Sequence, residues 1–90
     1  MTAIERVQTG LRLEKGMLKV IRGLAEYMEI SMAELTEGII LHALEGKPVP
    51  FDDVTLKKIA QLKDVYDMQF SAQDAHKLTE ASDRGASNDV

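Results

Sequence analysis

The chain has 90 residues and no cysteine, and its 11 basic and 15 acidic residues give a formal net charge of −4. This length allows one small domain, and the lack of cysteine excludes disulfides and thiolate metal sites as a means of stabilising it. The apolar runs are too short to span a membrane and the N-terminus lacks the pattern of an export signal, so we expect a cytoplasmic protein with no membrane partner.

Residues 7–13 show the alternation of a half-buried β-strand. One side would be mostly apolar and the other polar or glycine; the first set is Val7, Thr9, Leu11 and Leu13, and the second is Gln8, Gly10 and Arg12. A single strand cannot satisfy its own backbone groups, and no later segment has a strand pattern. The same strand of a second copy could pair with it about a two-fold axis, so the sequence predicts a homodimer.

Two helices should follow. Apolar residues at three- and four-residue spacing predict an amphipathic helix from about Lys15 to about Met28, which Gly16 and Gly23 weaken locally. Ser31 followed by Glu34 has the spacing of a capping box and predicts the start of a second helix, with Gly46 as its stop. The intervening turn has only two or three residues, which predicts a helical hairpin.

The two prolines in Lys47–Pro50 predict an extended connector. A third helix should start after Asp52 or Asp53 and end near Met68, and the Ser71–Asp74 spacing allows a short fourth one. We therefore divide the chain into a first domain of residues 5–46, a helical extension of residues 47–80 and a disordered tail of residues 81–90.

The order of strand, helix, tight turn opening on a serine, and helix resembles that of the Arc- and MetJ-like ribbon-helix-helix family. The residues that carry the resemblance are Gln8–Leu13, Leu18, Ile21, Ala25 and Ser31–Leu35, and the similar region runs from Leu11 to Leu44. The resemblance implies a mainly α fold: a ribbon-helix-helix homodimer with extra C-terminal helices. Its implied function is that of a repressor that binds double-stranded DNA and reads the major groove with its paired strands.

The resemblance also implies site residues. Gln8, Gly10 and Arg12 would face the bases, where arginine can pair with guanine and glutamine with adenine. The amides of Ser31 and Met32 would hold a phosphate, as the dipole of the second helix also favours. The predicted dimer core consists of Val7, Leu11, Leu13, Leu18, Ile21, Leu35, Ile40 and Leu44.

Charge is unevenly distributed despite the acidic total. Between Arg6 and Arg22 the chain carries five basic residues and the single acid Glu14, and the five acids from Glu26 to Glu45 follow with no basic residue among them. One surface can therefore be positive, and we add Arg6 and Lys15 as candidate phosphate contacts.

Catalysis is not indicated. His42 lies beside the apolar stripe of the second helix, and neither it nor His76 has partners at metal-ligand spacing. There is also no nucleophile–base set and no phosphate-binding glycine loop. We expect no enzymatic activity, no metal and no cofactor.

Two other functions and one other fold remain open. The chain could be an antitoxin whose residues 51–80 bind a toxin, because the composition changes at the connector. It could be a protein-interaction module that has lost DNA binding, for which Gly10, Glu29 and the net charge argue. The alternative fold is a plain helical bundle with residues 7–13 disordered, which the regular alternation there disfavours.

Overall fold

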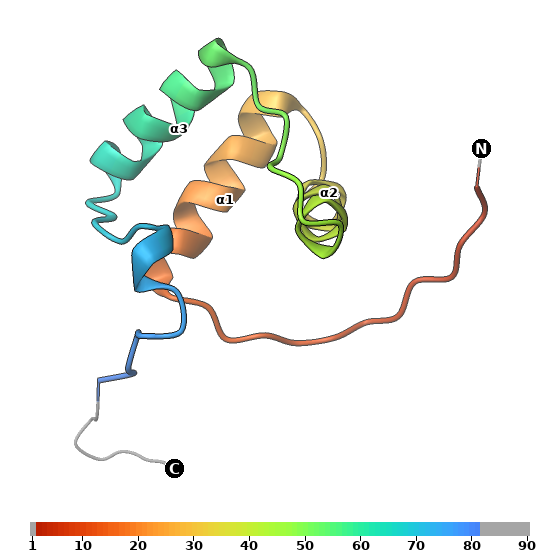
Figure 1. The fold of residues 1–90 in the computed structure, drawn as a ribbon, viewed down its shortest axis with the longest axis horizontal. Helices are drawn as coiled ribbons and strands as arrows, with labels where there is room; N and C mark the ends of the chain where they lie inside the picture. Colours follow the sequence, from red (N-terminus) through yellow and green to blue (C-terminus); the bar gives the residue numbers. More distant parts are fainter. Residues whose placement is uncertain (1, 82–90) are drawn as a thin grey trace.

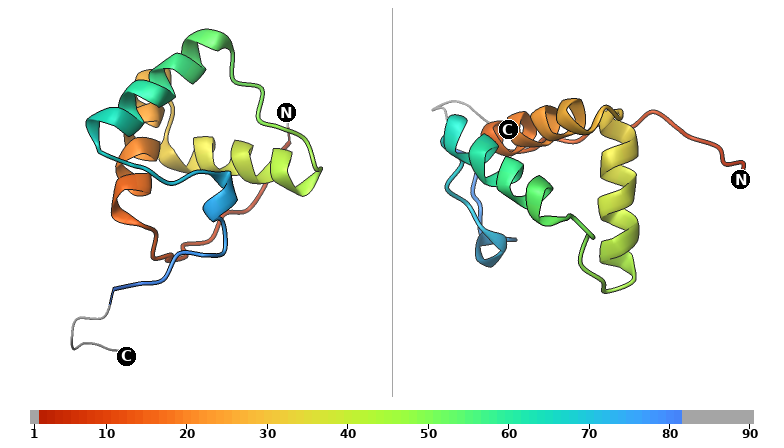
Figure 2. Two further views of the ribbon diagram at one scale, coloured as in Figure 1. Left: turned by 60° about the vertical axis from the view of Figure 1, so that its left-hand side comes forward. Right: turned by 90° about the horizontal axis from the view of Figure 1, so that it is seen from above.

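The computed structural model describes residues 2–81 and shows three α-helices around one small core. They are α1 (Lys15–Met28), α2 (Met32–Leu44) and α3 (Asp53–Val65), followed by the 3₁₀ turn η1 at Ala72–Asp74. α3 packs along α1 and makes the larger contact with it (Figure 1). α2 crosses α1 near the C-terminal end of α1 and extends away from it (Figure 2).

The β-strand predicted for residues 7–13 is absent, and the prediction of a ribbon-helix-helix fold is wrong. No strand occurs in residues 2–81, and residues 7–13 are exposed and have no backbone hydrogen bond to another described segment. A strand exists only as part of a ladder, whereas the helices satisfy their own backbone groups and leave no strand edge to pair with. The described chain is all-helical.

The structure contains the three helices that the sequence predicts. Each helix begins after a residue whose side chain caps its first turn. The helix predicted from Lys15 to Met28 is confirmed. The carboxylate or hydroxyl at each N-cap accepts a hydrogen bond from the backbone amide three residues later. These pairs are Glu14 with Met17 at 2.8 Å, Ser31 with Glu34 at 3.0 Å, and Asp52 with Thr55 at 2.8 Å.

All three helices end in a Schellman motif, in which one residue adopts the left-handed conformation and the next amide bonds back to the fifth carbonyl before it. The left-handed residues are Glu29, Gly46 and Asp67, with φ of 59°, 69° and 53°. The closing bonds run from Ile30 to Ala25, from Lys47 to His42 and from Met68 to Lys63, at 3.0, 2.9 and 2.8 Å. The motif at Asp67 ends α3 at Val65, earlier than the predicted Met68.

We expect Glu29→Gly to stabilise the protein by about 0.5–1 kcal/mol, because glycine avoids the steric cost of the left-handed conformation. The substitution also removes a negative charge from the C-terminal end of α1, where the helix dipole disfavours it. Urea denaturation followed by far-UV circular dichroism measures the change. Glu26→Gly, within the same helix, is the control and should destabilise. A lower midpoint for Glu29→Gly would contradict this account.

The core is small and lies where α1 meets its two neighbours. Only Val20, Leu24, Ala25 and Leu35 are buried among the described hydrophobic residues. α1 and α3 approach closely at Gly23, where an added Cβ would lie 3.0 Å from Leu62 Cδ2.

Two lysine–tyrosine contacts flank the close approach of α1 and α3. Lys19 Nζ lies 5.8 Å from the centre of the Tyr66 ring, and Lys58 Nζ lies 5.1 Å from that of Tyr27. Each pair joins α1 to α3 or to the residue at its C-terminal end, and each lies within the range of a cation–π interaction. The segment after the connector is thus docked on α1 over the length of α3.

Candidate functional site

The N-terminal segment, residues 2–13, holds the predicted base-contacting residues and lies on the surface. Gln8, Gly10 and Arg12 are all exposed, and no backbone hydrogen bond within the described chain involves this segment. A Cβ added at Gly10 would meet no atom within 4 Å, so nothing in the structure requires a glycine there. The backbone groups of this segment are therefore not committed to secondary structure.

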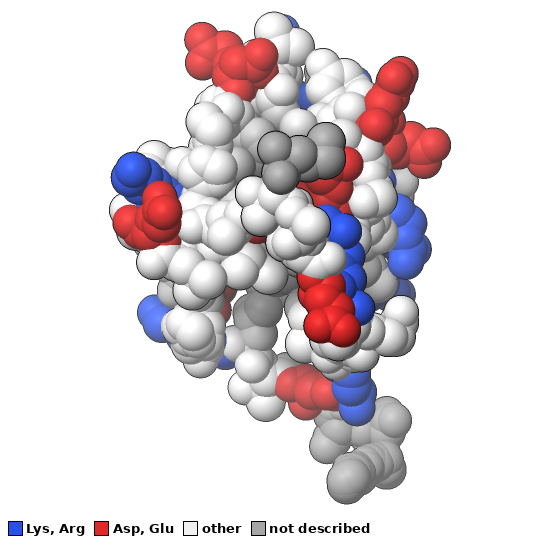
Figure 3. All heavy atoms as spheres, turned by 90° about the vertical axis from the view of Figure 1, so that its right-hand side faces the viewer, with Lys and Arg blue, Asp and Glu red and all other residues white. Residues whose placement is uncertain are grey.

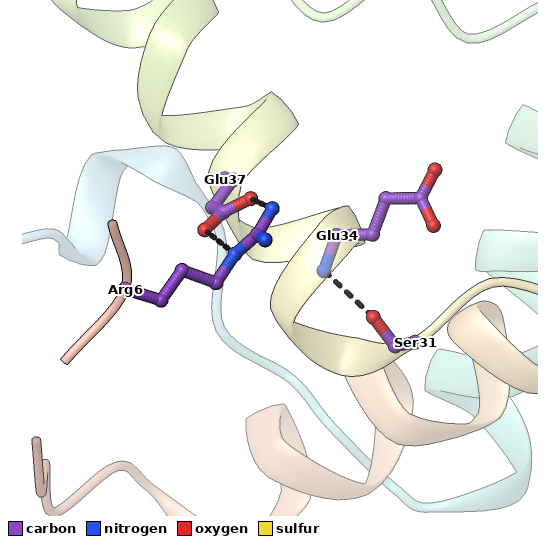
Figure 4. Close-up of polar contacts among 4 residues, drawn as sticks. All are labelled: Arg6, Ser31, Glu34 and Glu37. Carbon is purple, nitrogen blue, oxygen red and sulfur yellow. Dashed lines mark hydrogen bonds and ion pairs between the residues drawn. The ribbon is translucent and has the colours of Figure 1, made fainter. Parts of the chain in front are cut away.

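Arg6 joins the N-terminal segment to α2. Its guanidinium donates two hydrogen bonds of 2.8 Å to the Glu37 carboxylate (Figure 4). The hydrogen bonds lower the pKa of Glu37 and raise that of Arg6, so both groups stay charged at neutral pH. The predicted phosphate contact is thus occupied by a carboxylate in the free chain.

Arg12 has an acidic partner of its own at the other end of the chain. Its guanidinium pairs with Glu80, and the two side chains remain 83% and 70% exposed. Ion pairs exposed to this degree contribute little to stability, because solvent and salt screen them. Both predicted arginines therefore bind carboxylates on the surface, and they do so at two separate places.

The start of α2 carries the other predicted phosphate contacts. The amides of Ser31 and Met32 have no hydrogen-bond acceptor among the described residues. The Ser31 hydroxyl accepts from the amide of Glu34, but the Glu34 side chain points away from Ser31, so only half of the capping box forms (Figure 4). Lys15 is exposed at the first position of α1, apart from this helix end.

The predicted DNA contacts do not form one patch on a single chain. On the side that carries the N-terminal segment and α2, basic side chains lie beside acidic ones and most of the surface is neither (Figure 3). The assignment of Arg6, Gln8, Gly10, Arg12, Lys15, Ser31 and Met32 to DNA thus stays a prediction.

The residues predicted for a dimer core fall into two groups in the single chain. Leu35 is buried, and Leu18 and Ile21 are partly buried. The others are exposed large hydrophobic residues, namely Val7, Leu11, Leu13, Ile40 and Leu44. A single chain therefore leaves most of this set exposed to solvent.

Sequence reasoning missed an apolar hollow on the concave side of the three helices. It has a volume of about 410 Å³, and its walls come from all three helices, the connector and the segment after α3. Its apolar lining includes Val20, Ile21, Ile39, Phe51, Phe70 and Leu78. The signal in the sequence was weak, because Phe70 and Leu78 lie outside any regular apolar stripe.

His42 Nδ1 lies 2.8 Å from the Gly38 carbonyl of its own helix, so the ring has a local partner. Residues 2–81 contain no group of three acidic, histidine or cysteine side chains placed to bind a metal. None of the helices in this range is long and apolar enough to cross a membrane.

Comparison with other proteins adds no assignment: no protein-family model, no curated protein and no solved structure matches this chain.

Proposed function

We propose that this protein is a cytoplasmic regulator that binds double-stranded DNA as a homodimer, with the N-terminal segment as its DNA-contacting part. The observation that carries the proposal is the exposure of this segment, in which Gln8 and Arg12 lie outside the helical core. Arginine and glutamine make the specific bidentate contacts with guanine and adenine.

The local charge supports this proposal more than the net charge does. The five basic residues between Arg6 and Arg22 are all exposed, and only one acid lies among them. Phosphate contacts supply much of the affinity of proteins for DNA, and they need such a surface.

The glutamate partners of Arg6 and Arg12 are consistent with DNA binding, because phosphates can replace them. Both ion pairs are on the surface, with the Arg6 and Glu37 side chains 60% and 40% exposed. An exposed pair is cheap to separate, and a phosphate or guanine offers the same guanidinium a bidentate acceptor. In the free protein the carboxylates would hold both arginines until DNA displaces them.

We expect Arg12→Ala to weaken binding to a selected DNA site about 5- to 150-fold, the range of one lost bidentate base contact. The site would first be enriched from random duplexes by the unaltered protein, and affinities would be measured at two salt concentrations. Lys57→Ala, an exposed charge on α3, is the matched control and should leave the preference among sites unchanged. Unaltered discrimination by Arg12→Ala would remove this residue from the site.

A second candidate function is a protein-interaction module without DNA binding. The specific observation in its favour is that Arg6 and Arg12 each have a carboxylate partner, so neither arginine is free in the isolated chain. A protein that enriches no sequence and shows no dependence of DNA affinity on salt would favour this function. An antitoxin role for residues 51–80 has less support, because α3 is already packed on α1.

A further inference from the structure

α2 has more apolar surface than its own chain covers. Ile39, Ile40 and Leu41 are consecutive, and successive helical residues point about 100° apart, so one neighbouring surface cannot cover all three. Ile39 packs against the core, whereas Leu41 is 64% exposed and Leu44 is 79% exposed. Ile40, Leu41 and Leu44 form what we call the α2 ridge. A helix that is apolar on more than one side is normally covered on more than one side.

The ridge cannot enter the hollow of its own chain. Ile39 lines the hollow. Leu41 is two positions further along α2, so at about 100° per residue its side chain points roughly 200° away from Ile39. The chain therefore has an apolar ridge and an apolar hollow that face different ways, and neither can cover the other within one molecule.

The exposed area of the chain is larger than that of a compact monomer, and the excess includes the exposed residues 2–13 as well as the α2 ridge. A compact monomer of this length exposes about 5,200 Å², whereas this chain exposes 7603 Å². If the ten residues outside the described range were each allowed the largest area of an extended chain, about 1,600 Å² in all, an excess of about 800 Å² would remain. A standard interface buries about 800 Å² on each partner.

We infer that the hollow is the receptor for the α2 ridge of a second copy of this chain. Insertion of each ridge into the hollow of the other copy gives a closed two-fold assembly with two identical contacts, the usual form of a homodimer. Phe70 and Leu78 form part of the wall, so the segment after α3 belongs to this interface. The inference supplies the dimer that the proposed function assumes, but it rests on the free protein alone.

The composition of the hollow favours this occupant over a small ligand. Ligand sites combine apolar walls with a few polar groups that orient the ligand. Here the polar groups near the apolar lining are Lys63, Ser71 and Asp74, and the Asp74 carboxylate already accepts a hydrogen bond of 2.8 Å from the Ser71 amide. The apolar side chains of the α2 ridge do not need free polar groups in the hollow to orient them.

The first test measures the mass of the full-length protein by light scattering over a concentration series without DNA. The unaltered chain should be a dimer, and Leu44→Glu should raise the dissociation constant at least about a hundredfold, because each contact would then bury a carboxylate. Val65→Glu is the matched control, since Val65 is 72% exposed on α3 and does not line the hollow, and it should stay dimeric. A monomeric unaltered chain, or a dimer lost in Val65→Glu but kept in Leu44→Glu, would overturn the inference.

The second test decides the matter even if Leu44→Glu fails to fold. The chain has no cysteine, so single cysteines can be placed at will. Differently tagged Leu44→Cys and Ala75→Cys chains would be mixed and oxidised, since Ala75 lines the hollow. We expect a disulfide between the two tags, and none when Val65→Cys replaces Ala75→Cys. The reverse pattern would place the ridge elsewhere and refute the docking. Because neither test contains DNA, a failure here is separable from a failure to bind an operator.

Discussion

Leu24→Ala is expected to remove a large part of the stability of the protein and to shift its unfolding to much lower urea concentration. Leu24 is 2% exposed and lies in the cluster with Ala25 and Leu35 that joins α1 to α2. Truncation of a buried leucine costs about 2–5 kcal/mol, through the lost burial and the cavity that remains. Domains of this size have a stability of only about 5–13 kcal/mol, and the core here has few other members.

Far-UV circular dichroism in a urea series would measure the loss. Leu56→Ala makes the same chemical change at a half-exposed position of α3 and is the control. It should shift the free energy of unfolding by less than about 1 kcal/mol, as is usual for surface positions. If both variants unfold at the same urea concentration as the unaltered chain, the core has been placed incorrectly.

Gly23→Leu is expected to separate α3 from α1 and to lower the free energy of unfolding by about 1–3 kcal/mol. A Cβ at this position already comes within 3.0 Å of Leu62 Cδ2, and the further atoms of a leucine have no room between the helices. The gain in helix propensity over glycine, about 0.5–1 kcal/mol, offsets only part of this cost.

Gly23→Ala provides the graded comparison for this prediction. It needs only a small movement of the flexible Leu62 side chain and gains the full propensity of alanine, so we expect a change close to zero. The fluorescence of Tyr27 and Tyr66, which contact lysines across the α1–α3 interface, would report the separation in Gly23→Leu. Equal effects of alanine and leucine would show that the helices are not in close contact at Gly23.

Local signals in the sequence predicted the helices because the physics behind them is local. The spacing of Leu24 and its neighbours predicts the apolar face of α1, and Ser31 and Asp52 cap the helices that they were expected to open. The end of α3 was missed because Asp67, not a glycine, takes the left-handed position that stops it.

Packing between distant segments was not predictable in the same way. The alternation at residues 7–13 shows which side chains would share a face, but it does not show that a partner strand exists, and the described chain contains none. No signal in the sequence indicated that α3 approaches α1 closely at Gly23. Phe70 and Leu78 line the hollow together with residues of α1 that are far away in the sequence. No local pattern in the sequence predicts that these residues line the same hollow.

The preference of α1 for α3 over its neighbour α2 has a consequence for synthesis on the ribosome. The contact residue Leu62 is made nearly forty positions after Gly23, and a ribosome that adds about 5–20 residues per second needs several seconds for them. During that interval the nascent chain contains the apolar face of α1 but not α3, the helix that packs against it in the folded protein. Chaperones that bind exposed hydrophobic segments would meet the unfinished protein at this stage, and codon choice between these positions would set how long the exposure lasts.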